Sequence, residues 1–303
     1  MKAAIYFNEL QPLLYGYYIC KGVIFLHRKI SAAVFTVLTA MFMCGCTSDK
    51  NSVGQSTEYN GRGGRTPAET AFLTDGKEKV CYGQGYETDS DNRPVGAIQA
   101  QEKYGSYGGR FIFGKDDKTI RLTFDEGYEN GCTGKILDIL KEKKVTATFY
   151  VTLDYVKSSP ELVQRMINEG HEVGNHSCTH PSLPDISDDM VFEEIHGLET
   201  YISDNFGGYK TVTMRPPRGE FSVRTLRIAK NMGYDTVLWS FAYNDWNTDA
   251  QPDRDTAYRR ITSATHNGAV YLLHAVSETN TAILPDVIDY WLDNGYTVKS
   301  ISG

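Results

Sequence analysis

Five short polar clusters in this 303-residue chain contain the residue types that hydrolytic enzymes use. The first two hold a pair of adjacent carboxylates, Asp125 and Glu126, and a pair of imidazoles, His176 and His180. Two histidines at this i, i+4 spacing can reach one metal ion if a helical turn brings them together. A carboxylate beside such an ion can take a proton from water, so the two clusters predict metal-assisted hydrolysis.

Three further clusters add positive charge, a second acid–base group and an aromatic side chain. They are Arg215-Pro216-Pro217-Arg218-Gly219, Asn244-Asp245-Trp246 and Leu272-Leu273-His274. The two prolines remove backbone donors and stiffen their turn, so the arginines beside them are held in place. Singly, each of the five clusters is more often a solvated turn or a satisfied core residue. Their joint position at the ends of predicted strands favours one shared site.

The elements that must position these clusters alternate along the chain. Seven β-rich runs are predicted, at residues 119–124, 145–151, 172–176, 211–215, 235–241, 269–274 and 297–301. Helices are predicted between them, at residues 133–143, 160–169, 187–205, 222–232, 255–266 and 280–294. This alternation is typical of parallel βαβ units. Because no nucleotide-binding glycine motif follows the first strand, we expect a (β/α) barrel with catalysis at the carboxyl ends of its strands.

The five clusters, written TFDEG, HSCTH, RPPRG, NDW and LLH, resemble the five motifs of the polysaccharide deacetylases. This family is also called the NodB-homology domain or carbohydrate esterase family 4, and the resemblance covers residues 105–303. The longer strings that begin at Thr123, Arg215 and Tyr271 are similar to those of the delta-lactam-biosynthetic de-N-acetylases. Those enzymes act on N-acetylmuramic acid in the peptidoglycan of spore-forming bacteria. The resemblance implies an α/β fold, a distorted (β/α)7 barrel of the NodB-homology type, which agrees with the seven predicted strands.

The resemblance also implies a divalent metal ion, expected to be Zn²⁺, bound by the neutral imidazoles of His176 and His180. At the third ligand position the family has an aspartate, where this chain has Glu126, one methylene longer. Asp125 would be the general base that takes the proton of the attacking water. Arg215 would pair with Asp125 and hold its carboxylate ionised and oriented.

The remaining implied roles concern the oxyanion, the leaving amine and the acetyl group. The backbone N–H of Arg218 would share the oxyanion with the metal. His274 would protonate the departing amine, and Asp245 would orient His274 and raise its pKa. Trp246 and Leu273 would form the walls of the pocket for the acetyl methyl group.

Three functions are consistent with these motifs. The first is removal of acetyl groups from N-acetylmuramic acid of peptidoglycan, a step toward muramic delta-lactam in the spore cortex. The second is the same chemistry on N-acetylglucosamine in peptidoglycan or another polysaccharide, and the third is a non-catalytic wall-binding lipoprotein. Arg218 favours the first, because a guanidinium matches the lactyl carboxylate of muramic acid in bidentate geometry. The alternative for Arg218 is a weak surface pair with Glu220 or a nearby aspartate.

The amino-terminal part of the chain bears on location. Residues 1–26 have no assigned role, and residues 27–46 resemble a signal peptide with a basic cluster, an apolar run and a lipobox-like end at Cys46. We expect an extracytoplasmic protein, secreted to the cell wall or anchored in the membrane through a lipidated Cys46. Residues 47–104 are predicted to be a flexible tether and a transitional segment, and residues 105–303 the catalytic domain. Outside residues 1–46 the chain has 27 Lys and Arg against 37 Asp and Glu, and this net charge of −10 argues against nucleic acid as the main partner.

Overall fold

The computed structural model describes residues 76–303, which belong to one compact unit. The segment at residues 1–26, the predicted signal peptide at residues 27–46 and the tether up to residue 75 lie outside the described residues. Among the described residues, no helix is both long and apolar enough to cross a lipid bilayer. The lipid anchor at Cys46 therefore stays a prediction from the sequence.

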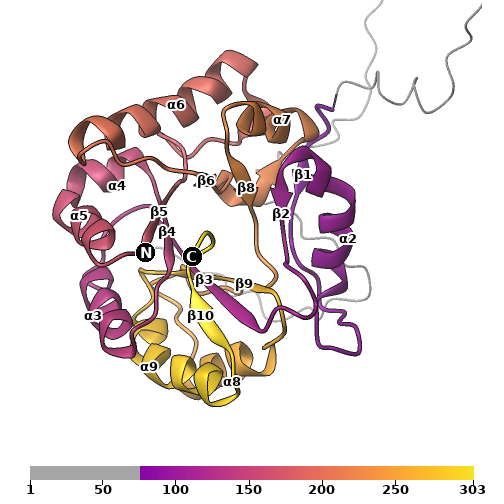
Figure 1. The fold of residues 1–303 in the computed structure, drawn as a ribbon, viewed down its shortest axis with the longest axis vertical. Coiled ribbons are helices and arrows are strands. Elements are labelled where there is room, and N and C mark those ends of the chain that lie inside the picture. The colour runs from indigo at the N-terminus through magenta and orange to yellow at the C-terminus, as the bar shows by residue number, and fades with distance from the viewer. Residues whose placement is uncertain (1–75) are drawn as a thin grey trace, which may run out of the picture. The chain divides into compact units, whose positions relative to one another are not determined.

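Parallel strands curl into a distorted barrel at the centre of the unit (Figure 1). The sheet order is β10 (Thr297–Lys299), β3 (Thr119–Glu126), β4 (Thr148–Val151), β5 (Glu172–Asn175), β6 (Thr213–Met214), β8 (Asp235–Val237) and β2 (Gly109–Arg110). β9 (Ala269–His274) also pairs with β3, and a parallel bridge between Phe241 and Tyr271 joins the chain after β8 to β9. All seven predicted strands are present, so the predicted α/β fold of the (β/α)7 type is confirmed.

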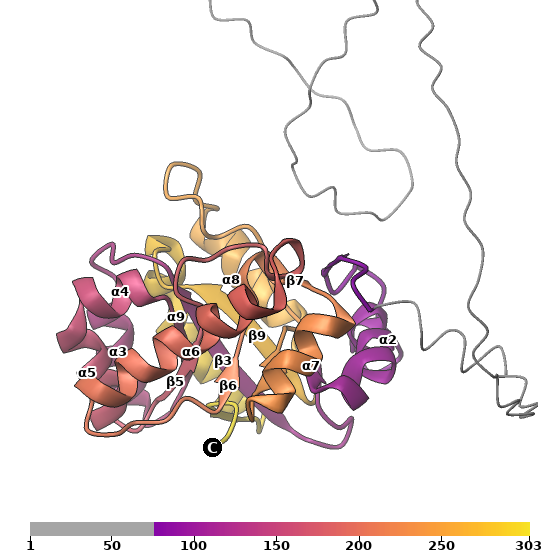
Figure 2. The ribbon, with the colours of Figure 1, turned by 90° about the horizontal axis from the view of Figure 1, so that it is seen from above.

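Helices surround the barrel (Figures 1 and 2). In chain order they are α2 (Val95–Tyr104), α3 (Thr133–Lys143), α4 (Leu153–Ser158), α5 (Pro160–Asn168), α6 (Asp188–Asn205), α7 (Val223–Asn231), α8 (Arg254–Ser263) and α9 (Glu278–Asp293). Serine hydroxyls fix the starts of three of them, because Ser187, Ser222 and Ser277 accept hydrogen bonds from the first turns of α6, α7 and α9. The six predicted helices are present, and α2 and α4 are additional.

The alternation of side chains along β3 separates two environments. Ile120, Leu122 and Phe124 point toward the helices and belong to the main hydrophobic core. Thr123 and Asp125 lie on the opposite, barrel-facing side, where both accept hydrogen bonds from the same arginine. The barrel-facing side chains are therefore the ones available to a site at the carboxyl ends of the strands.

The folded unit begins before residue 105. β1 (Val80–Cys81) pairs in antiparallel register with β7 (Glu220–Phe221), directly after the RPPRG cluster. Tyr82 and Tyr104 pack on Phe111 in a second hydrophobic core. Residues 76–104, for which the sequence predicts a tether and a transitional segment, thus contain regular elements that pack against the barrel.

Candidate active site

The carboxyl ends of neighbouring strands bring four of the predicted residues to one end of the barrel. Asp125 on β3 and His274 on β9 are Cα partners in the parallel ladder, so their side chains share the barrel-facing side. His176 follows β5 and Arg215 follows β6, the next strands around the sheet after β4. Four of the five clusters therefore lie where a barrel enzyme carries its catalytic residues.

Arg215 is a fully buried charge with a complete set of partners. Its guanidinium donates to the carbonyl oxygens of Val237 and Leu238 at 3.1 and 3.2 Å, and to Thr123 Oγ1 and Asp125 Oδ1 at 2.8 Å each. Burial alone would raise the pKa of Asp125, but the Arg215 charge, with smaller contributions from nearby groups, lowers that pKa below its ordinary value. The geometry keeps Asp125 an ionised and oriented carboxylate.

His176 and His180 form the second part of the site, with ring centres 4.9 Å apart. His176 Nδ1 lies 2.8 Å from the carbonyl oxygen of Arg215, which can only accept, so Nδ1 carries the proton. Burial lowers the pKa of His176 and lowers the pKa of His180 to about 4, so both imidazoles are neutral near pH 7. His176 Nε2 therefore presents a lone pair toward Asp125 Oδ2, 3.6 Å away.

The lone pairs of His176 Nε2 and Asp125 Oδ2 face each other across a gap that favours a cation. Neutral imidazole nitrogens beside a carboxylate are donors that Zn²⁺ accepts, so these residues fit the divalent ion that the resemblance implies. Within residues 76–303, no group of three or more His, Cys, Asp or Glu side chains is arranged to hold a metal ion. The histidine pair therefore stays a candidate for holding the ion, and no third His, Cys, Asp or Glu side chain is arranged with it among residues 76–303.

The loop that carries the two histidines is held by groups outside the motif. Ser177 and His180 have φ values of 70° and 58°, so the chain bends through the left-handed region instead of the expected helical turn. Asn175 Oδ1 accepts a hydrogen bond from the backbone of Ser177, and Ser177 Oγ accepts one from the backbone of His180. Glu194 on α6 accepts from the N–H and hydroxyl of Thr179 at 2.8 and 2.6 Å. Asn175, Ser177 and Glu194 are common polar residue types, so the sequence alone does not indicate that they hold the histidine loop.

Glu126 does not join the histidine pair. It follows Asp125 on β3, so its side chain points to the opposite, helix-facing side of the strand. There it is fully buried and lies 3.4 Å from the hydroxyl of Thr133 at the start of α3. Burial, helped by the charge of Glu129, raises the pKa of Glu126 well above its ordinary value. In this structure the Glu126 carboxylate contacts Thr133 and not the histidine pair, so its role as the third metal ligand stays a prediction from the resemblance.

His274 and Asp245 form a tight pair beside Asp125. Asp245 is completely buried, its Oδ1 lies 2.7 Å from His274 Nδ1, and its Oδ2 accepts from the backbone N–H of His274 at 2.8 Å. Burial would lower the pKa of His274, but the charge and hydrogen bond of Asp245 outweigh it and raise that pKa above its ordinary value. Because Nδ1 is engaged by Asp245, Nε2 is the nitrogen left for a substrate.

Arg218 occupies a strained turn at the rim of the site. Its φ is 61°, and its side chain is exposed. The next residue, Gly219, has a φ of 67°, and a β-carbon there would lie 2.6 Å from Trp239, so no larger residue fits. The Arg218 guanidinium forms no ion pair with any carboxylate of residues 76–303, whereas Glu220 lies 2.9 Å from Lys79. The structure therefore does not show the alternative pair of Arg218 with Glu220. The nearby aspartate is Asp185, whose pKa is lowered first by hydrogen bonds from Lys79 and Ser182 and to a smaller extent by the charge of Arg218.

The two residues predicted to wall the acetyl pocket lie in different environments. Trp246 directly follows the buried Asp245 and leaves 56% of its surface exposed. Leu273 is buried in the main core, on the opposite side of β9 from His274. Leu272 is the leucine that shares the barrel-facing side with His274. Because adjacent residues of a strand point to opposite sides, Leu273 faces the main core and not the side of β9 that carries His274.

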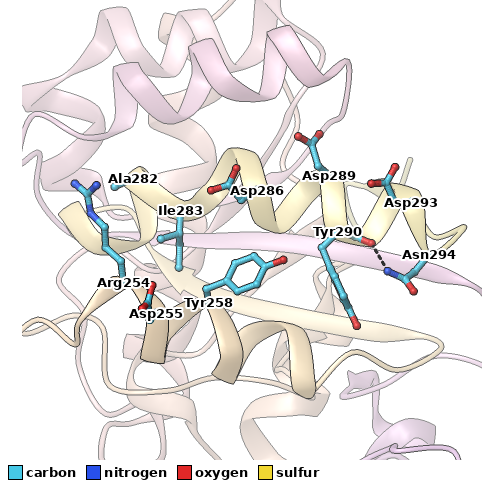
Figure 3. Close-up of a pocket in the computed structure, with 10 residues that line it drawn as sticks. All are labelled: Arg254, Asp255, Tyr258, Ala282, Ile283, Asp286, Asp289, Tyr290, Asp293 and Asn294. Carbon is cyan, nitrogen blue, oxygen red and sulfur yellow. Dashed lines mark hydrogen bonds between the residues drawn. The ribbon is translucent and has the colours of Figure 1, made fainter.

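A separate pocket lies between α8 and α9 (Figure 3). It is lined by Arg254, Asp255, Tyr258, Ala282, Ile283, Asp286, Asp289, Tyr290, Asp293 and Asn294. None of these residues belongs to the five clusters. The pocket is therefore not part of the candidate active site.

The chain is similar to known deacetylases. The family model described as polysaccharide deacetylase matches residues 114–237. The chain is 43% identical over 200 residues to the peptidoglycan-N-acetylmuramic acid deacetylase PdaA of Bacillus subtilis, covering 66% of this chain and 75% of that protein. It is 33% identical over 187 residues to the peptidoglycan-N-acetylglucosamine deacetylase PgdA of Listeria monocytogenes, covering 62% of this chain and 39% of that protein.

The fold agrees with this similarity. The solved structure of Bacillus subtilis PdaA, described as a family 4 carbohydrate esterase, matches with a TM-score of 0.71 at 39% identity, covering 75% of this chain and 96% of that chain. Likeness in both sequence and fold across most of a relative's length shows a common family and not a common architecture alone. The chain therefore belongs to the polysaccharide deacetylases of carbohydrate esterase family 4, and it is a hydrolase of amide-linked acetyl groups.

Proposed function

We propose that this chain removes the acetyl group from N-acetylmuramic acid residues of peptidoglycan. The similarity to PdaA supports this substrate class. The observation that carries the choice of sugar is the exposed Arg218 guanidinium, which has no ion-pair partner within residues 76–303. The product is a free amine on muramic acid, next to a lactyl carboxylate with which it can form the delta-lactam of spore cortex.

Asp125 is the general base in this proposal. Its carboxylate is held by Arg215 at 2.8 Å and lies 3.6 Å from His176 Nε2, so it borders the place where an attacking water belongs. A divalent ion held by His176 and His180, which we expect to be Zn²⁺, would supply a Lewis acid for the acetamide carbonyl. Asp125 takes the proton of the water as its oxygen adds to the carbonyl carbon.

Two further groups act on the tetrahedral carbon and the leaving nitrogen. The backbone N–H of Arg218 donates to the oxyanion, from a turn that Gly219 and Trp239 fix by close packing. His274 gives its Nε2 proton to the sugar nitrogen as the C–N bond breaks. Asp245 supports this step, because it raises the pKa of His274 and so keeps the acid protonated at higher pH.

The side chain of Arg218 is proposed to bind the lactyl carboxylate. It lies close enough to His180 to contribute, after burial and the charge of His176, to the lowered pKa of that imidazole. A second guanidinium near Arg215 and a metal ion is unfavourable unless an anion meets it. Muramic acid supplies that anion once its stem peptide is removed, and N-acetylglucosamine does not.

Deacetylation of N-acetylglucosamine is the second candidate. The 33% identity to PgdA favours it, because the chemistry at the acetamide would be unchanged. The third candidate, a non-catalytic wall-binding protein, is opposed by the geometry: base, acid, arginine and histidine pair all meet at one end of the barrel.

The proposed location follows from the proposed substrate. A chain that acts on peptidoglycan works outside the cytoplasm, which agrees with the signal-peptide character of residues 27–46. We propose that a lipidated Cys46 holds it at the membrane and that its substrate strands belong to the spore cortex. Substitution Cys46→Ser should release the protein from membranes into the soluble fraction, and unchanged membrane association would contradict the anchor.

The substrate proposal is tested by acetate release from two glycans. Peptide-free muramic acid-containing strands and N-acetylglucosamine oligomers are incubated with the metal-loaded protein, with Asp125→Asn as the inactive control. Mass spectrometry of the strands should locate the deacetylation on muramic acid. Deacetylation only of N-acetylglucosamine would support the second candidate, and absence of acetate from both substrates would support the third.

A further inference from the structure

A chain of buried side chains runs from α9 to the catalytic histidine. The hydroxyl of Tyr243 donates to Asn280 Oδ1, and Asn280 Nδ2 donates to Asp245 Oδ2 at 2.5 Å. Asp245 Oδ1 in turn lies 2.7 Å from His274 Nδ1. Tyr243, Asn280 and Asp245 expose 7%, 2% and none of their surfaces, so these contacts are sheltered from water.

We propose that Asn280, supported by a hydrogen bond from Tyr243, is a positioning residue that fixes the Asp245 carboxylate and thereby sets the orientation and proton affinity of His274. The catalytic meaning of this inference rests on the proposed function, in which His274 is the general acid. The contacts themselves do not depend on the identity of the sugar. Neither residue lies in the five motifs, and their roles follow only from the structure.

The Asp245 carboxylate, which can only accept, fixes which way the Asn280 amide points, and Tyr243 completes the arrangement by donating to the amide oxygen. A tyrosine hydroxyl can donate to the amide oxygen, which leaves the amide NH₂ facing Asp245. The flipped amide would place Asn280 Oδ1 against a carboxylate oxygen, where two acceptors repel each other. Tyr243 therefore acts on His274 through Asn280 and Asp245.

The backbone of Asn280 is held as firmly as its side chain. Ser277 Oγ accepts from the backbone N–H of Asn280 at 3.0 Å, which caps the start of α9. The same hydroxyl donates to Gln251 Oε1 at 2.5 Å, and Gln251 Nε2 donates to the backbone carbonyl of Asp245 at 2.8 Å. The start of α9 and the NDW loop are thus joined through both the backbone and the side chain of Asp245.

Loss of the Asn280 amide has a defined electrostatic consequence. Asp245 accepts hydrogen bonds from three donors, namely His274 Nδ1, the backbone N–H of His274 and Asn280 Nδ2. Without the amide, more of the carboxylate's charge acts on His274, so the pKa of His274 should rise further.

Other charges near His274 stay in place when Asn280 is changed. Asp125 on β3 raises the pKa of His274, Arg215 after β6 lowers it, and His176 after β5 also interacts with it. At the Tyr243 end of this series of hydrogen-bonded side chains, Arg260 on α8 lies over the Tyr243 ring at 5.4 Å. None of these side chains is a hydrogen-bond partner of Asn280, so the variant isolates the amide.

The first experiment measures the pKa of His274 directly, without substrate, by NMR titration of labelled imidazoles. Asn280→Leu should raise this pKa by about half a unit to one unit, whereas Asp245→Asn should lower it. Tyr243→Phe, a milder change that keeps the ring in place, should shift it in the same direction as Asn280→Leu and by less. The double variant should show no more than the shift of Asn280→Leu, because Tyr243 acts through Asn280.

The matched control is Tyr271→Phe, which removes another buried hydroxyl, one that donates to the carbonyl of Ile261 at 3.0 Å. It should leave the pKa of His274 unchanged even if it lowers stability. An unmoved pKa in both Asn280→Leu and Tyr243→Phe would overturn the inference.

The second experiment reads the kinetics of acetate release. Asn280→Leu should lower kcat roughly 10–50-fold with KM within about twofold, and should move the basic limb of the pH profile upward. A pKa shift without any acetate release by the wild type would retain the positioning role and reject the proposed function. Equal losses in Asn280→Leu and Tyr271→Phe, with no shift of the limb, would reduce Asn280 to a structural residue.

Discussion

Asp125 and Glu126 are neighbours in the chain, but their side chains lie on opposite sides of β3. Asp125 faces the barrel, with Arg215 Nη1 at 2.8 Å, while Glu126 is buried toward α3 with the hydroxyl of Thr133 at 3.4 Å. The alternation of a strand imposes this separation. In this structure the Glu126 carboxylate is therefore turned away from the histidine pair.

Metal affinity should depend on the histidine pair and not on Glu126. Glu126→Gln keeps the size of the side chain and should leave Zn²⁺ affinity within about threefold. His180→Ala should lower the affinity by more than the roughly 10–100-fold that loss of an outer-shell partner costs. Isothermal titration of the metal-free protein with Zn²⁺ measures both. If Glu126→Gln loses the ion as completely as His180→Ala, Glu126 is a ligand and its side chain moves when the metal binds.

Glu126 should also make stability fall with rising pH. Its pKa in the folded chain is raised above the ordinary value of 4.5, so the folded state keeps a proton that the unfolded state releases. This contribution to the free energy of unfolding is fully present below about pH 4.5 and is lost as pH rises toward the folded pKa. The free energy of unfolding, measured with urea at several pH values, should therefore fall less steeply with rising pH for Glu126→Gln than for the wild type. Parallel curves would mean that Glu126 is ionised in the folded state.

The sequence predicts the elements and the strand ends that carry the clusters, and the two side chains that the structure turns away from the site follow one pattern. Five clusters at strand ends predicted the meeting of Asp125, His176 and His274, because parallel strands carry their carboxyl ends to one face. The family resemblance implies roles for Glu126 and Leu273, but each adjoins a barrel-facing residue and its own side chain points to the opposite side of the strand.

Supporting residues from distant segments could not be predicted. Asn280 and Glu194 lie on α9 and α6, and only the folded chain brings them to Asp245 and to the histidine loop. Asparagine and glutamate are common on helices, so their types carry no signal. Tertiary contacts of this kind require the packing of whole elements, which one sequence does not reveal.

The general base and the general acid should each account for a large part of the rate. Asp125→Asn and His274→Ala should each reduce kcat by roughly 10²–10⁴-fold, the range typical of acid–base groups. Both variants should still bind Zn²⁺, because the two histidines remain. Acetate release and Zn²⁺ titration on the same preparations test this. If kcat falls by less than about tenfold in either variant, another residue performs the role proposed for the one replaced.

Asp245→Asn should shift the basic limb of the pH–rate profile to lower pH. Asp245 raises the pKa of His274, and an amide in its place removes the charge that does so. The acid form of His274 is then lost at lower pH, so activity declines earlier as pH rises. Rates of acetate release across pH 6–10 measure the basic limb. An unmoved limb would mean that Asp245 does not set the pKa of the general acid.

Arg218→Ala should weaken action on muramic acid and spare action on N-acetylglucosamine. The exposed guanidinium has no ion-pair partner within residues 76–303, so its removal leaves no buried carboxylate uncompensated. Loss of a charge-assisted hydrogen bond to the lactyl carboxylate should cost about 1.5–3 kcal/mol, or roughly 10–150-fold in kcat/KM. Acetate release from peptide-free muramic strands and from N-acetylglucosamine oligomers gives the two values to compare.

Two further variants separate recognition by Arg218 from a general effect on charge or fold. Arg218→Lys keeps the positive charge and loses the planar fork, so its loss on muramic strands should be intermediate. Arg227→Ala removes another exposed arginine, on α7 and over the Tyr107 ring at 5.0 Å, and should leave both substrates unaffected. An equal loss on both sugars for Arg218→Ala would mean that the side chain supports the strained turn and its backbone N–H. The preference for muramic acid would then require a different source.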